Sequence, residues 1–570
     1  MAQKIKIYLG ASSLLTSLGD KKRTLESMSK GVCGLRYDEQ FGMMTGAIKG
    51  VYRKDGSTRF ESIVVNQLKT VLAESGLRLS DSNTQFVLST TKGDVGMLSE
   101  TNGKNIPQGA YLYDTAMRIA RRFNCAKRPI VISNACISGV SAFIVARNIL
   151  LNEDIQHVVV AGCDVLSEFI TSGFASFKSV SSDPCRPYDA ARDGLTLGEA
   201  CGVIVLTADE HFAARPLIRL TGGAITNDAN HISGPSRTGD GLFFALCAAM
   251  KEAETDASQI GFVNSHGTAT LYNDEMESKA MALARLNDIP LNGLKGYIGH
   301  TLGASGVVET IICAEELRQG RIFGTLGFEQ QGTSVKLSVS SEIQPITAPR
   351  CIKTASGFGG CNAAIVLDAE EPDKTIRVDK YEMREAIVVA AYSLPQSSEP
   401  FGDFIRAQYR GLAESNMKFF KMSDLCKALY VSAENLLRGF DLTKYEPTRR
   451  AIILSNSVSS LETDAQHQQI ISRRLPEGAS PAVFVYTLPN VAAGEICIKH
   501  VFQGDNTFFI EDADSGIAEN YARSLIANDK ADIVICGWCD KLGNNWNVKL
   551  KLLKNNSYGT THSGIEEPFD

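Results

Sequence analysis

Residues 129–139 read Pro-Ile-Val-Ile-Ser-Asn-Ala-Cys-Ile-Ser-Gly, and this stretch decides the fold. It predicts a buried strand, a turn of small residues and then a helix, with Cys136 where the strand becomes the helix. Unpaired backbone N–H groups at a helix N-terminus carry partial positive charge, which stabilises a thiolate. The residues alone leave two interpretations open for Cys136, a reactive nucleophile and a packed apolar thiol.

Strands and helices alternate on both sides of this segment. Apolar runs bounded by small and polar residues predict strands at 84–91, 156–162 and 202–206, and residues 112–123 and 139–151 predict helices between them. Alternation of this kind is typical of an α/β fold with largely buried sheets.

Composition excludes several classes of protein. The 570 residues are 44% hydrophobic and 21% charged, which is ordinary for a globular protein and excludes a disordered chain. Fifty-eight basic against 64 acidic residues give a net charge of −6, so we expect neither nucleic acid nor an anionic membrane as a partner.

Cysteine usage and apolar patterning indicate a location. The 14 cysteines lack the spacing of a disulfide framework. Residues 1–9 predict an opening strand and lack the apolar core of a signal peptide. The apolar stretch 131–151 contains Arg147, which favours a buried helix over a membrane span. We therefore expect a cytoplasmic protein with reduced thiols.

Two seams divide the chain. Residues 207–216 are polar, and residues 369–378 are charged, contain a proline and follow an apolar strand. We predict four parts: an N-terminal half at 1–207, a second half at 216–368, a linker at 369–378 and a further domain at 379–570.

The last part repeats features of the first. Residues 450–456 resemble the strand at 84–91, residues 531–537 resemble the strand that ends at Gly162, and Asp514-Ser515-Gly516 resembles Ile137-Ser138-Gly139. Two strands and a turn indicate a partial duplication that stops after its first half.

Two histidines lie in unusual surroundings for core residues. His266 follows an apolar strand in a loop of small residues and hydroxyls, and His300, in a second such loop, comes five residues after Lys295. A histidine can hydrogen-bond a developing oxyanion or act as a base near neutral pH. With a cysteine, two of them could hold an acyl thioester and stabilise an enolate, which would suit carbon–carbon bond formation between thioesters.

A glycine-rich segment, Ser356-Gly-Phe-Gly-Gly-Cys-Asn362, precedes the last strand of the second half. A plain tight turn is the simplest interpretation. The segment could also bring a backbone N–H close to a ligand, as an oxyanion hole requires.

Taken together, these segments resemble the β-ketoacyl-acyl-carrier-protein synthases, condensing enzymes with a thiolase-like fold, over roughly residues 1–368. The motifs in common are N-A-C-I-S-G at 134–139, R-P-Y-D with R-D-G and G-E at 186–199, H-G-T-A-T at 266–270, K-x-x-x-x-H-T-x-G-A at 295–304 and G-F-G-G-x-N at 357–362. The resemblance implies an α/β thiolase-like αβαβα layered fold of two similar halves, with a partial third half at the C-terminus.

The resemblance also implies a reaction. Cys136 would carry the acyl group, while His266 and His300 would hold the malonyl thioester carbonyl and stabilise the enolate formed on decarboxylation. This Cys-His-His set implies an elongating synthase of fatty acid, polyketide or polyene synthesis.

Supporting roles follow from the same resemblance. Lys295 would orient the site together with Glu309, and Thr268 and Thr270 would contact a phosphopantetheine arm. The backbone N–H of Phe358, with that of Cys136, would form the oxyanion hole. Phosphopantetheine would arrive on a partner acyl carrier protein with acyl and malonyl thioesters, so no bound cofactor or metal is expected. Members are commonly homodimers, and we expect a homodimer here.

Some residues depart from the family pattern or need a separate interpretation. Ser356 stands where the family usually has Phe, which puts the usual gating of the acyl pocket in doubt, and Ala200 replaces a glycine that we expect to be dispensable. His231 lies in a loop that matches the family and is interpreted as structural.

Residues of about 379–556 resemble the first half of the same fold, without its cysteine: Asp512-Ala513-Asp514 stands near the expected position. The C-x-x-C pair Cys536 and Cys539 has no second pair of ligands nearby, so an ordinary strand end is favoured over a zinc or redox site. This part is predicted to be a truncated, catalytically degenerate copy.

Two other classes of function stay open at this point. The whole chain could be a non-catalytic scaffold, similar to a chain-length-factor partner of another ketosynthase. It could also be a simple acyltransferase or thioesterase that uses Cys136. Release of CO2 from malonyl-carrier protein would distinguish condensation from both of these alternatives.

Overall fold

The computed structural model describes residues 5–50, 56–369, 384–412, 416–474 and 478–556. Of the predicted linker at 369–378, only Ala369 lies within these ranges. The boundaries at residues 1 and 570 lie outside the described residues as well. We refer to residues 384–556 as the C-terminal unit.

The first sheet, here called the N-terminal sheet, has five strands in the order β1-β9-β7-β5-β6. Their bounds are β1 Tyr8–Thr16, β9 Ala200–Thr207, β7 His157–Asp164, β5 Thr84–Ser89 and β6 Ile130–Ile132. The strands predicted at 84–91, 156–162 and 202–206 are confirmed. The predicted opening strand was placed too early, because β1 begins at Tyr8.

The second sheet follows the order β10-β17-β16-β11-β12-β14. Its strands are β10 Arg219–Asn227, β17 Cys361–Asp368, β16 Arg350–Gly357, β11 Phe262–Asn264, β12 Pro290–Asn292 and β14 Ser338–Val339. Both sheets mix parallel and antiparallel pairs.

Helices form the remaining layers. α4 (Ser138–Asn152) and α9 (Ser305–Gln319) contact each other and strands of both sheets, so they form the central layer. α2 (Arg59–Ser75) covers the outer face of the N-terminal sheet, while α6 (Asp240–Glu252) lies on the second sheet with α7 (Leu271–Leu283) beside it. The layered thiolase-like order predicted for the two halves is confirmed.

Close contact between the two central helices depends on glycine. A Cβ on Gly139 would lie 2.7 Å from the backbone nitrogen of Val307, and one on Gly306 would lie 2.3 Å from that of Val140. The residues Ala135–Asn152 are the one described helical stretch that is long and apolar enough to cross a membrane, and 83% of it is buried inside the protein. Helix α4 is therefore a core helix.

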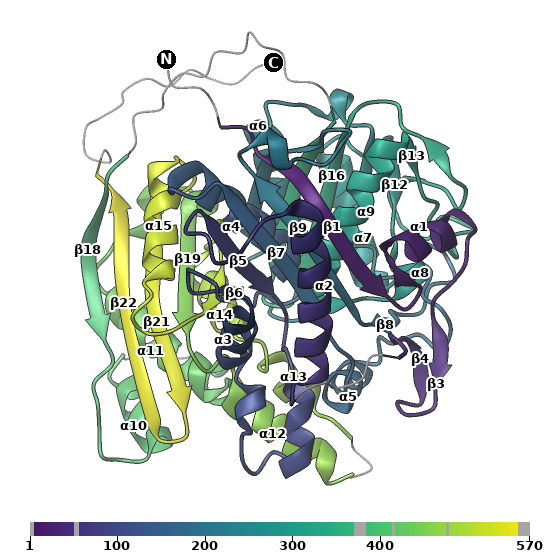
Figure 1. Ribbon diagram of the computed structural model, residues 1–570. Helices are drawn as coiled ribbons and strands as arrows, with labels where there is room; N and C mark the ends of the chain where they lie inside the picture. Colours follow the sequence, from purple (N-terminus) through teal and green to yellow (C-terminus); the bar gives the residue numbers. More distant parts are fainter. Residues whose placement is uncertain (1–4, 51–55, 370–383, 413–415, 475–477, 557–570) are drawn as a thin grey trace.

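The C-terminal unit contains a third set of strands, here called the C-terminal sheet, in the order β18-β22-β21-β19-β20. Its strands are β18 Ala386–Ser393, β22 Asn545–Asn555, β21 Ile533–Leu542, β19 Arg450–Asn456 and β20 Phe508–Ile510. α11 (Asp424–Leu436) and α15 (Ile517–Ala527) contact its strands (Figure 1).

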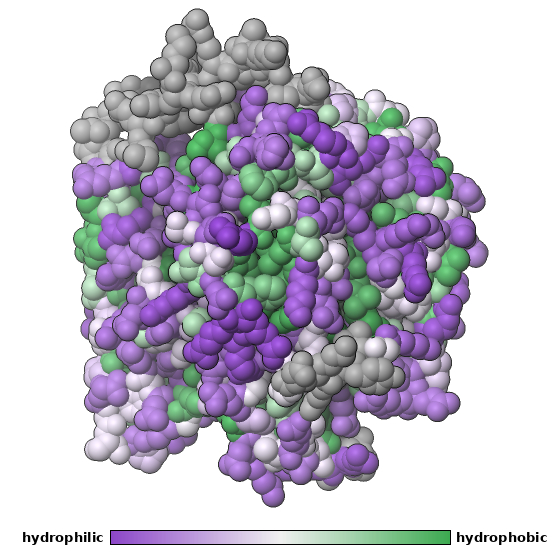
Figure 2. All heavy atoms as spheres, in the orientation of Figure 1, coloured by the Kyte–Doolittle hydropathy of each residue, from purple (hydrophilic) through white to green (hydrophobic). Residues whose placement is uncertain are grey.

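The N-terminal and C-terminal sheets join edge to edge. β20 pairs antiparallel with β6, with Phe509 opposite Ile132 and Ile510 opposite Val131. β6 contributes to the nucleophile segment, so the C-terminal unit reaches the sheet edge beside Cys136. At the other end, β18 pairs only with β22 among the described strands, and its Val388 and Val389 are exposed. Apolar side chains also lie among the hydrophilic ones on the face drawn in Figure 2.

The remaining elements connect these layers. They are β2 Gly19–Asp20, α1 Lys21–Ser29, β3 Arg36–Asp38, β4 Met43–Gly46, α3 Leu112–Arg122, α5 Glu168–Ser176, β8 Leu197–Gly198, α8 Lys295–Ile298, β13 Arg321–Ile322, β15 Gln344–Pro345, α10 Phe401–Arg410, α12 Leu461–Ser472, α13 Pro481–Val485 and α14 Asn490–His500, with short 3-10 turns between some of them.

The pairings correct one part of the predicted repeat. Ser89 of β5 lies opposite Gly162, whereas the matching Ser455 of β19 lies opposite Trp538. The counterpart of Gly162 is therefore Trp538, one residue beyond the predicted match. The sequence comparison aligned glycine with glycine, while strand register depends on backbone pairing between distant segments.

Candidate active site

The nucleophile segment folds as a strand, a tight turn and a helix. β6 ends at Ile132, and α4 begins at Ser138. The Ser138 hydroxyl donates to the Ala135 carbonyl (2.6 Å) and accepts from the Asn134 N–H (2.8 Å). Ala135 has a φ of 47°, a strained value for a residue with a side chain. These contacts hold Cys136 just before the first turn of α4.

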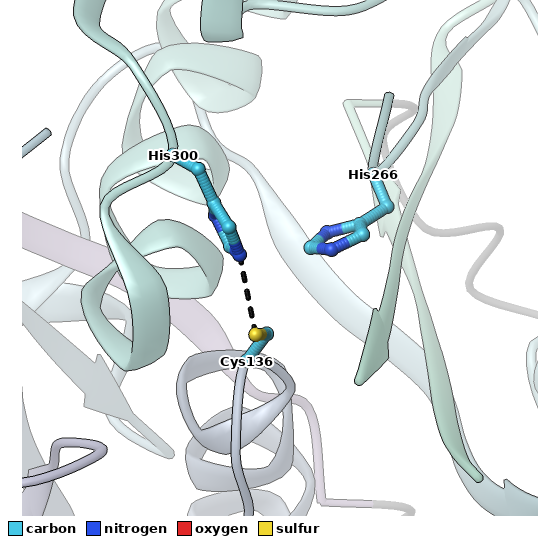
Figure 3. A group of neighbouring side chains, drawn as sticks. All are labelled: Cys136, His266 and His300. Carbon is cyan, nitrogen blue, oxygen red and sulfur yellow. Dashed lines mark hydrogen bonds between the residues drawn. The ribbon is translucent and has the colours of Figure 1, made fainter. Parts of the chain in front are cut away.

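The two predicted histidines meet this cysteine. His300 Nε2 lies 3.2 Å from Cys136 Sγ, and the rings of His266 and His300 are nearly perpendicular, with centroids 5.0 Å apart (Figure 3). All three side chains are buried, and one ligand atom from each lies within 4.8 Å of the others. Cys136 thus forms one cluster with two histidines that lie 130 and 164 positions further along the chain.

Glu277 of α7 fixes the position of the loop that contains His266. Its carboxylate accepts the backbone N–H groups of His266 and Gly267, each at 2.8 Å, and the hydroxyl of Tyr188 at 3.0 Å. In the same loop, the hydroxyls of Thr268 and Thr270 lie 2.9 Å apart. The loop geometry therefore depends on a buried carboxylate that the sequence analysis did not single out.

A buried ion network lies behind the histidines. Lys295 Nζ donates to Glu309 (2.8 Å) and to the His266 carbonyl (2.5 Å), as the predicted Lys295–Glu309 pairing requires. Lys353 also donates to Glu309, and to the Ser265 carbonyl at 3.2 Å. Burial opposes ionisation of Glu309, but the two lysines hold the pKa of its carboxyl below its ordinary value.

Burial decides the charge of the resting site. It raises the pKa of the Cys136 thiol to about 12, against the opposing effect of Lys295. Burial, followed by the positive charge of Lys295, lowers the pKa of His300 well below its usual range, and the same two causes act first on His266. The sequence left open a reactive nucleophile and a packed apolar thiol. Burial favours the neutral form of the thiol and of both histidines in the resting site.

The glycine-rich segment reaches the nucleophile. β16 ends at Gly357, where a Cβ would lie 3.1 Å from the Cys136 backbone nitrogen, and Phe358 follows directly. Ser356 is buried and donates to Asn362 at 2.7 Å, so its hydroxyl is used inside the strand pair. Ala200, the other departure from the family pattern, is fully buried in β9.

Aromatic side chains surround this end of the site. Phe358 stacks on Phe174 with centroids 6.1 Å apart and lies 5.3 Å from Phe177. Phe174 also meets the ring of His300 at 6.5 Å and that of Phe484 at 5.4 Å. Phe484 belongs to α13 of the C-terminal unit, which therefore contributes to the wall beside the cluster.

The trio also has the spacing of metal ligands, so its surroundings matter. A metal-bound histidine usually donates its second N–H to a carboxylate or carbonyl. His266 Nδ1 has no hydrogen-bond partner among the described residues, and His300 Nδ1 meets the Ser305 hydroxyl at 3.2 Å. Two buried ammonium groups face a single carboxylate, Glu309, behind the trio. These charges fit an anionic intermediate better than a dication.

Two other sequence candidates lie outside the cluster. His231 is exposed, and its Nδ1 accepts backbone N–H groups of Ser233 and Gly234, which agrees with the structural interpretation. Cys536 and Cys539 both lie inside β21 and are free thiols, as the interpretation as part of a strand requires. All 14 cysteines are free.

Two family descriptions match the chain. Residues 56–211 match "Beta-ketoacyl synthase, N-terminal domain", and residues 217–329 match "Beta-ketoacyl synthase, C-terminal domain". The 3-oxoacyl-[acyl-carrier-protein] synthase 2 of Vibrio cholerae is 32% identical over 256 residues, which cover 42% of this chain and 61% of that protein. A putative polyketide beta-ketoacyl synthase 1 of Streptomyces cyaneus is 30% identical and covers 44% and 63%.

Solved structures resemble different parts of the chain. A ketosynthase in complex with its chain length factor, from Xenorhabdus doucetiae, is 25% identical with a TM-score of 0.57 and covers 65% of this chain and 99% of that chain. The structure titled "PfaC Keto synthase-Chain length factor" is 14% identical, which shows the fold alone. Its TM-score is 0.77, and it covers 97% of this chain and 79% of that one.

The match to the curated relatives spans about three-fifths of their length. The two matched domains contain the cysteine turn and both histidine loops. Residues 56–211 and 217–329 are therefore similar to the N- and C-terminal domains of β-ketoacyl synthases.

Proposed function

We propose that the protein is a β-ketoacyl-acyl-carrier-protein synthase that condenses an acyl thioester on Cys136 with malonyl-carrier protein. The observation that carries this proposal is the buried contact of 3.2 Å between Cys136 Sγ and His300 Nε2, with the His266 ring beside it. A neutral histidine can donate a hydrogen bond to a carbonyl without carrying a charge, and both histidines are held neutral by burial.

The first half-reaction is acyl transfer. The Cys136 sulfur forms a bond to the acyl carbonyl carbon, and the bond from that carbon to the carrier thiol breaks. The thiol proton leaves Cys136 and ends on the departing phosphopantetheine thiol. The backbone N–H groups of Cys136 and Phe358 would stabilise the oxyanion of the tetrahedral intermediate.

The second half-reaction is decarboxylative condensation. The bond between the malonyl α-carbon and its carboxylate breaks, CO2 leaves, and the electron pair becomes an enolate whose oxygen accepts N–H groups from His266 and His300. The α-carbon then attacks the acyl carbonyl on Cys136, the carbon–sulfur bond breaks, and the thiolate that leaves takes up one proton from solvent. Ser305 can donate to His300 Nδ1 at 3.2 Å, which leaves the proton on Nε2 for this task.

The lysines support this chemistry through charge. Lys295 and Lys353 share the Glu309 carboxylate and contact the loop carbonyls of His266 and Ser265. Their positive charge favours the neutral form of each histidine and an anion between them. We infer that they position the histidine loop and stabilise the enolate electrostatically.

The partners follow from this reaction. Phosphopantetheine would arrive on an acyl carrier protein and pass Thr268 and Thr270, and the enzyme would need no resident cofactor. Fatty acid and polyketide or polyene synthesis both fit.

The C-terminal unit would act as a truncated, degenerate ketosynthase-like copy, and a cytoplasmic location is consistent with the buried α4 helix.

Support for the truncated copy comes from matching backbone roles. Asp164, the last residue of β7, accepts the backbone N–H groups of Thr91 and Lys92, and Asp540 in β21 accepts those of Ser457 and Val458. Since β20 occupies the open edge of β6, the expected homodimer would have to form through another surface.

The experiment is an intact-protein mass measurement after incubation with acyl-carrier protein. We expect a gain of one acyl group in the native chain and none in Cys136→Ala. His300→Ala should still take the acyl group, but its condensation with malonyl-carrier protein should fall at least about 100-fold, because a neutral donor to the enolate is lost.

The outcomes separate the alternatives. An adduct without CO2 release in the native chain would indicate a simple acyltransferase or thioesterase. No adduct at any chain length would favour the non-catalytic scaffold. Condensation by His300→Ala at the native rate would contradict the role given to His300.

A further inference from the structure

Three consecutive carbonyls of the glycine-rich segment each accept a side-chain or backbone hydrogen bond from elsewhere in the chain. The Gly359 carbonyl accepts from Asn227 Nδ2 at 2.8 Å, and the Gly360 carbonyl accepts from the Asp228 N–H at 2.7 Å. The Phe358 carbonyl accepts from Asn490 Nδ2 at 2.8 Å. Asn227 and Asp228 belong to the ketosynthase part, whereas Asn490 belongs to the C-terminal unit.

Asn490 is the first residue of α14 and is fully buried. Its Nδ2 also lies 3.7 Å from Cys361 Sγ, while its Oδ1 has no hydrogen-bond partner among the described residues. A buried amide that leaves one atom unpaired is costly, so the bond that its other atom makes to Phe358 needs a reason.

The two backbones meet closely at this point. A Cβ on Gly359 would lie 2.6 Å from Asn490 Nδ2, and a Cβ on Gly494, one turn along α14, would lie 2.7 Å from the Gly359 carbonyl oxygen. Only glycine fits at both positions without a shift. The helix therefore contacts the segment through its backbone as well as through one amide.

The start of α14 is itself anchored to the ketosynthase part. Lys92 Nζ donates to the carbonyl of Thr487 at 2.6 Å, three residues before Asn490, and to Asp464 at 2.6 Å. Lys92 directly follows Thr91, whose hydroxyl accepts the Gly303 N–H at 2.8 Å, close to His300 in the chain. Through the neighbouring residues Thr91 and Lys92, the start of α14 is therefore connected to the loop that contains His300.

We propose that Asn490 is a positioning residue for the oxyanion hole: its amide and the Ile232 carbonyl together fix the peptide that joins Phe358 to Gly359, which holds the chain directly after the Phe358 N–H and keeps that N–H in place for the oxyanion of the acyl-transfer step. This inference rests on the proposed function. A donor in an oxyanion hole works because it is already oriented when charge develops, and a small displacement of it costs rate. The C-terminal unit would thus complete a catalytic feature of the other part of the chain.

The test compares two reactions of the same thiol. Transfer from an acyl thioester passes through an oxyanion, whereas alkylation of Cys136 by iodoacetamide does not. We expect Asn490→Ala to lower kcat for acyl transfer about tenfold with little change in KM. Alkylation should stay within about twofold, because the thiol and its histidine are untouched.

A charge variant adds a pH readout. The carboxylate introduced by Asn490→Asp cannot donate to a carbonyl, but its protonated form can. Burial raises the pKa of such a carboxyl, so acyl transfer by Asn490→Asp should recover relative to the native protein as pH falls from 8 to 6. Asn490→Ala should show no such recovery.

Asn456→Asp is the matched control. Asn456 is equally buried in the C-terminal unit, and its Nδ2 donates to the Ser459 carbonyl at 2.8 Å, away from the glycine-rich segment. The ratio of acyl transfer to alkylation should be unchanged in this variant and should not vary with pH. Thermal melting of each variant shows which of them are folded.

An unchanged ratio in folded Asn490→Ala and Asn490→Asp would overturn the proposal while leaving the proposed function intact. An equal fall in acyl transfer and alkylation would also overturn it, since this result means a general distortion. If the native chain takes no acyl group, the proposed function fails first, and this inference fails with it.

Discussion

The N-terminal and C-terminal sheets share one strand order but have different faces. Gly162 of β7 and Gly202 of β9 lie opposite each other, and helix α9 packs against both. The corresponding pair in the C-terminal sheet is Trp538 and Lys549. A Cβ on Gly162 would already lie 2.6 Å from the Val307 side chain, so the bulk of Trp538 and Lys549 leaves no room for such a helix. The face that α9 covers on the N-terminal sheet therefore carries the exposed Lys549 on the C-terminal sheet.

The turns that follow strands β6 and β20 also differ, because one is buried and the other is exposed. Cys136 is buried between α4, α9 and the two histidine loops, whereas Ala513 in the matching turn is exposed. The proposed chemistry therefore depends on the second sheet and its loops, which lie within residues 216–368. The C-terminal unit contributes Phe484 to the wall beside the cluster and Asn490 to the contact with Phe358.

Moving the cysteine from its own turn to the matching turn of the C-terminal unit should have the largest effect on acyl transfer. We expect the double variant Cys136→Ala/Ala513→Cys to take no acyl group from carrier protein, because no histidine pair or oxyanion hole surrounds the new thiol. Iodoacetamide should still alkylate the new thiol, measured as the gain over Cys136→Ala because Cys247 is exposed as well. Intact-mass measurement of both reactions checks this, and acylation at the new position would mean that the surrounding loops are dispensable.

Removing the ion pair between the two parts should have the next largest effect. Within the described parts of the chain, Lys92 Nζ makes its hydrogen bonds to groups of the C-terminal unit: Asp464, the Ser460 hydroxyl and the Thr487 carbonyl. Lys92→Met leaves the buried Asp464 carboxylate without its cation and should lower the free energy of unfolding by about 3–5 kcal/mol.

The control for that change is Lys92→Met/Asp464→Leu, which removes both charges and should recover most of the loss. Chemical denaturation of the three proteins provides the free energies. Equal stability of Lys92→Met and the native chain would show that the two parts do not depend on this contact.

Single substitutions on the equivalent faces of the N-terminal and C-terminal sheets should have the smallest effect on the free energy of unfolding. Gly162→Ala places a methyl group against Val307 and should cost about 1–3 kcal/mol through overpacking. Lys549→Ala, on the exposed counterpart, should change the free energy of unfolding by no more than about 0.5 kcal/mol. Thermal melts of both variants test this difference, and similar shifts in the two would contradict the assigned roles of the faces.

Much of the fold was predictable because its strands and helices have local signatures. The turn around Cys136 and the loops of His266 and His300 combine small residues with apolar strands, so these segments stand out in the sequence. Glu277 and Lys353 were missed for the opposite reason. Each is a single charged residue whose role comes from a partner on another element, His266 at 11 positions and Glu309 at 44 positions along the chain.

The register of the repeat shows the same limit. Sequence similarity matched Gly537 with Gly162. The backbone pairing instead places Trp538 at the position equivalent to Gly162. A shift of one residue reverses which face of the sheet a side chain occupies. The true register explains why this face differs between the two sheets, which the sequence alignment could not.

By itself, the sequence determined the alternation of strands and helices, the order of five motifs and the identity of the cysteine and both histidines. The tertiary structure alone decided that these three side chains meet, that burial keeps them neutral, and that β20 closes the edge of β6. It also decided that Asn490 reaches Phe358 across 132 positions of sequence. The physical reason is that local patterns follow from neighbouring residues, whereas desolvation and hydrogen bonds between distant segments exist only once the chain is packed.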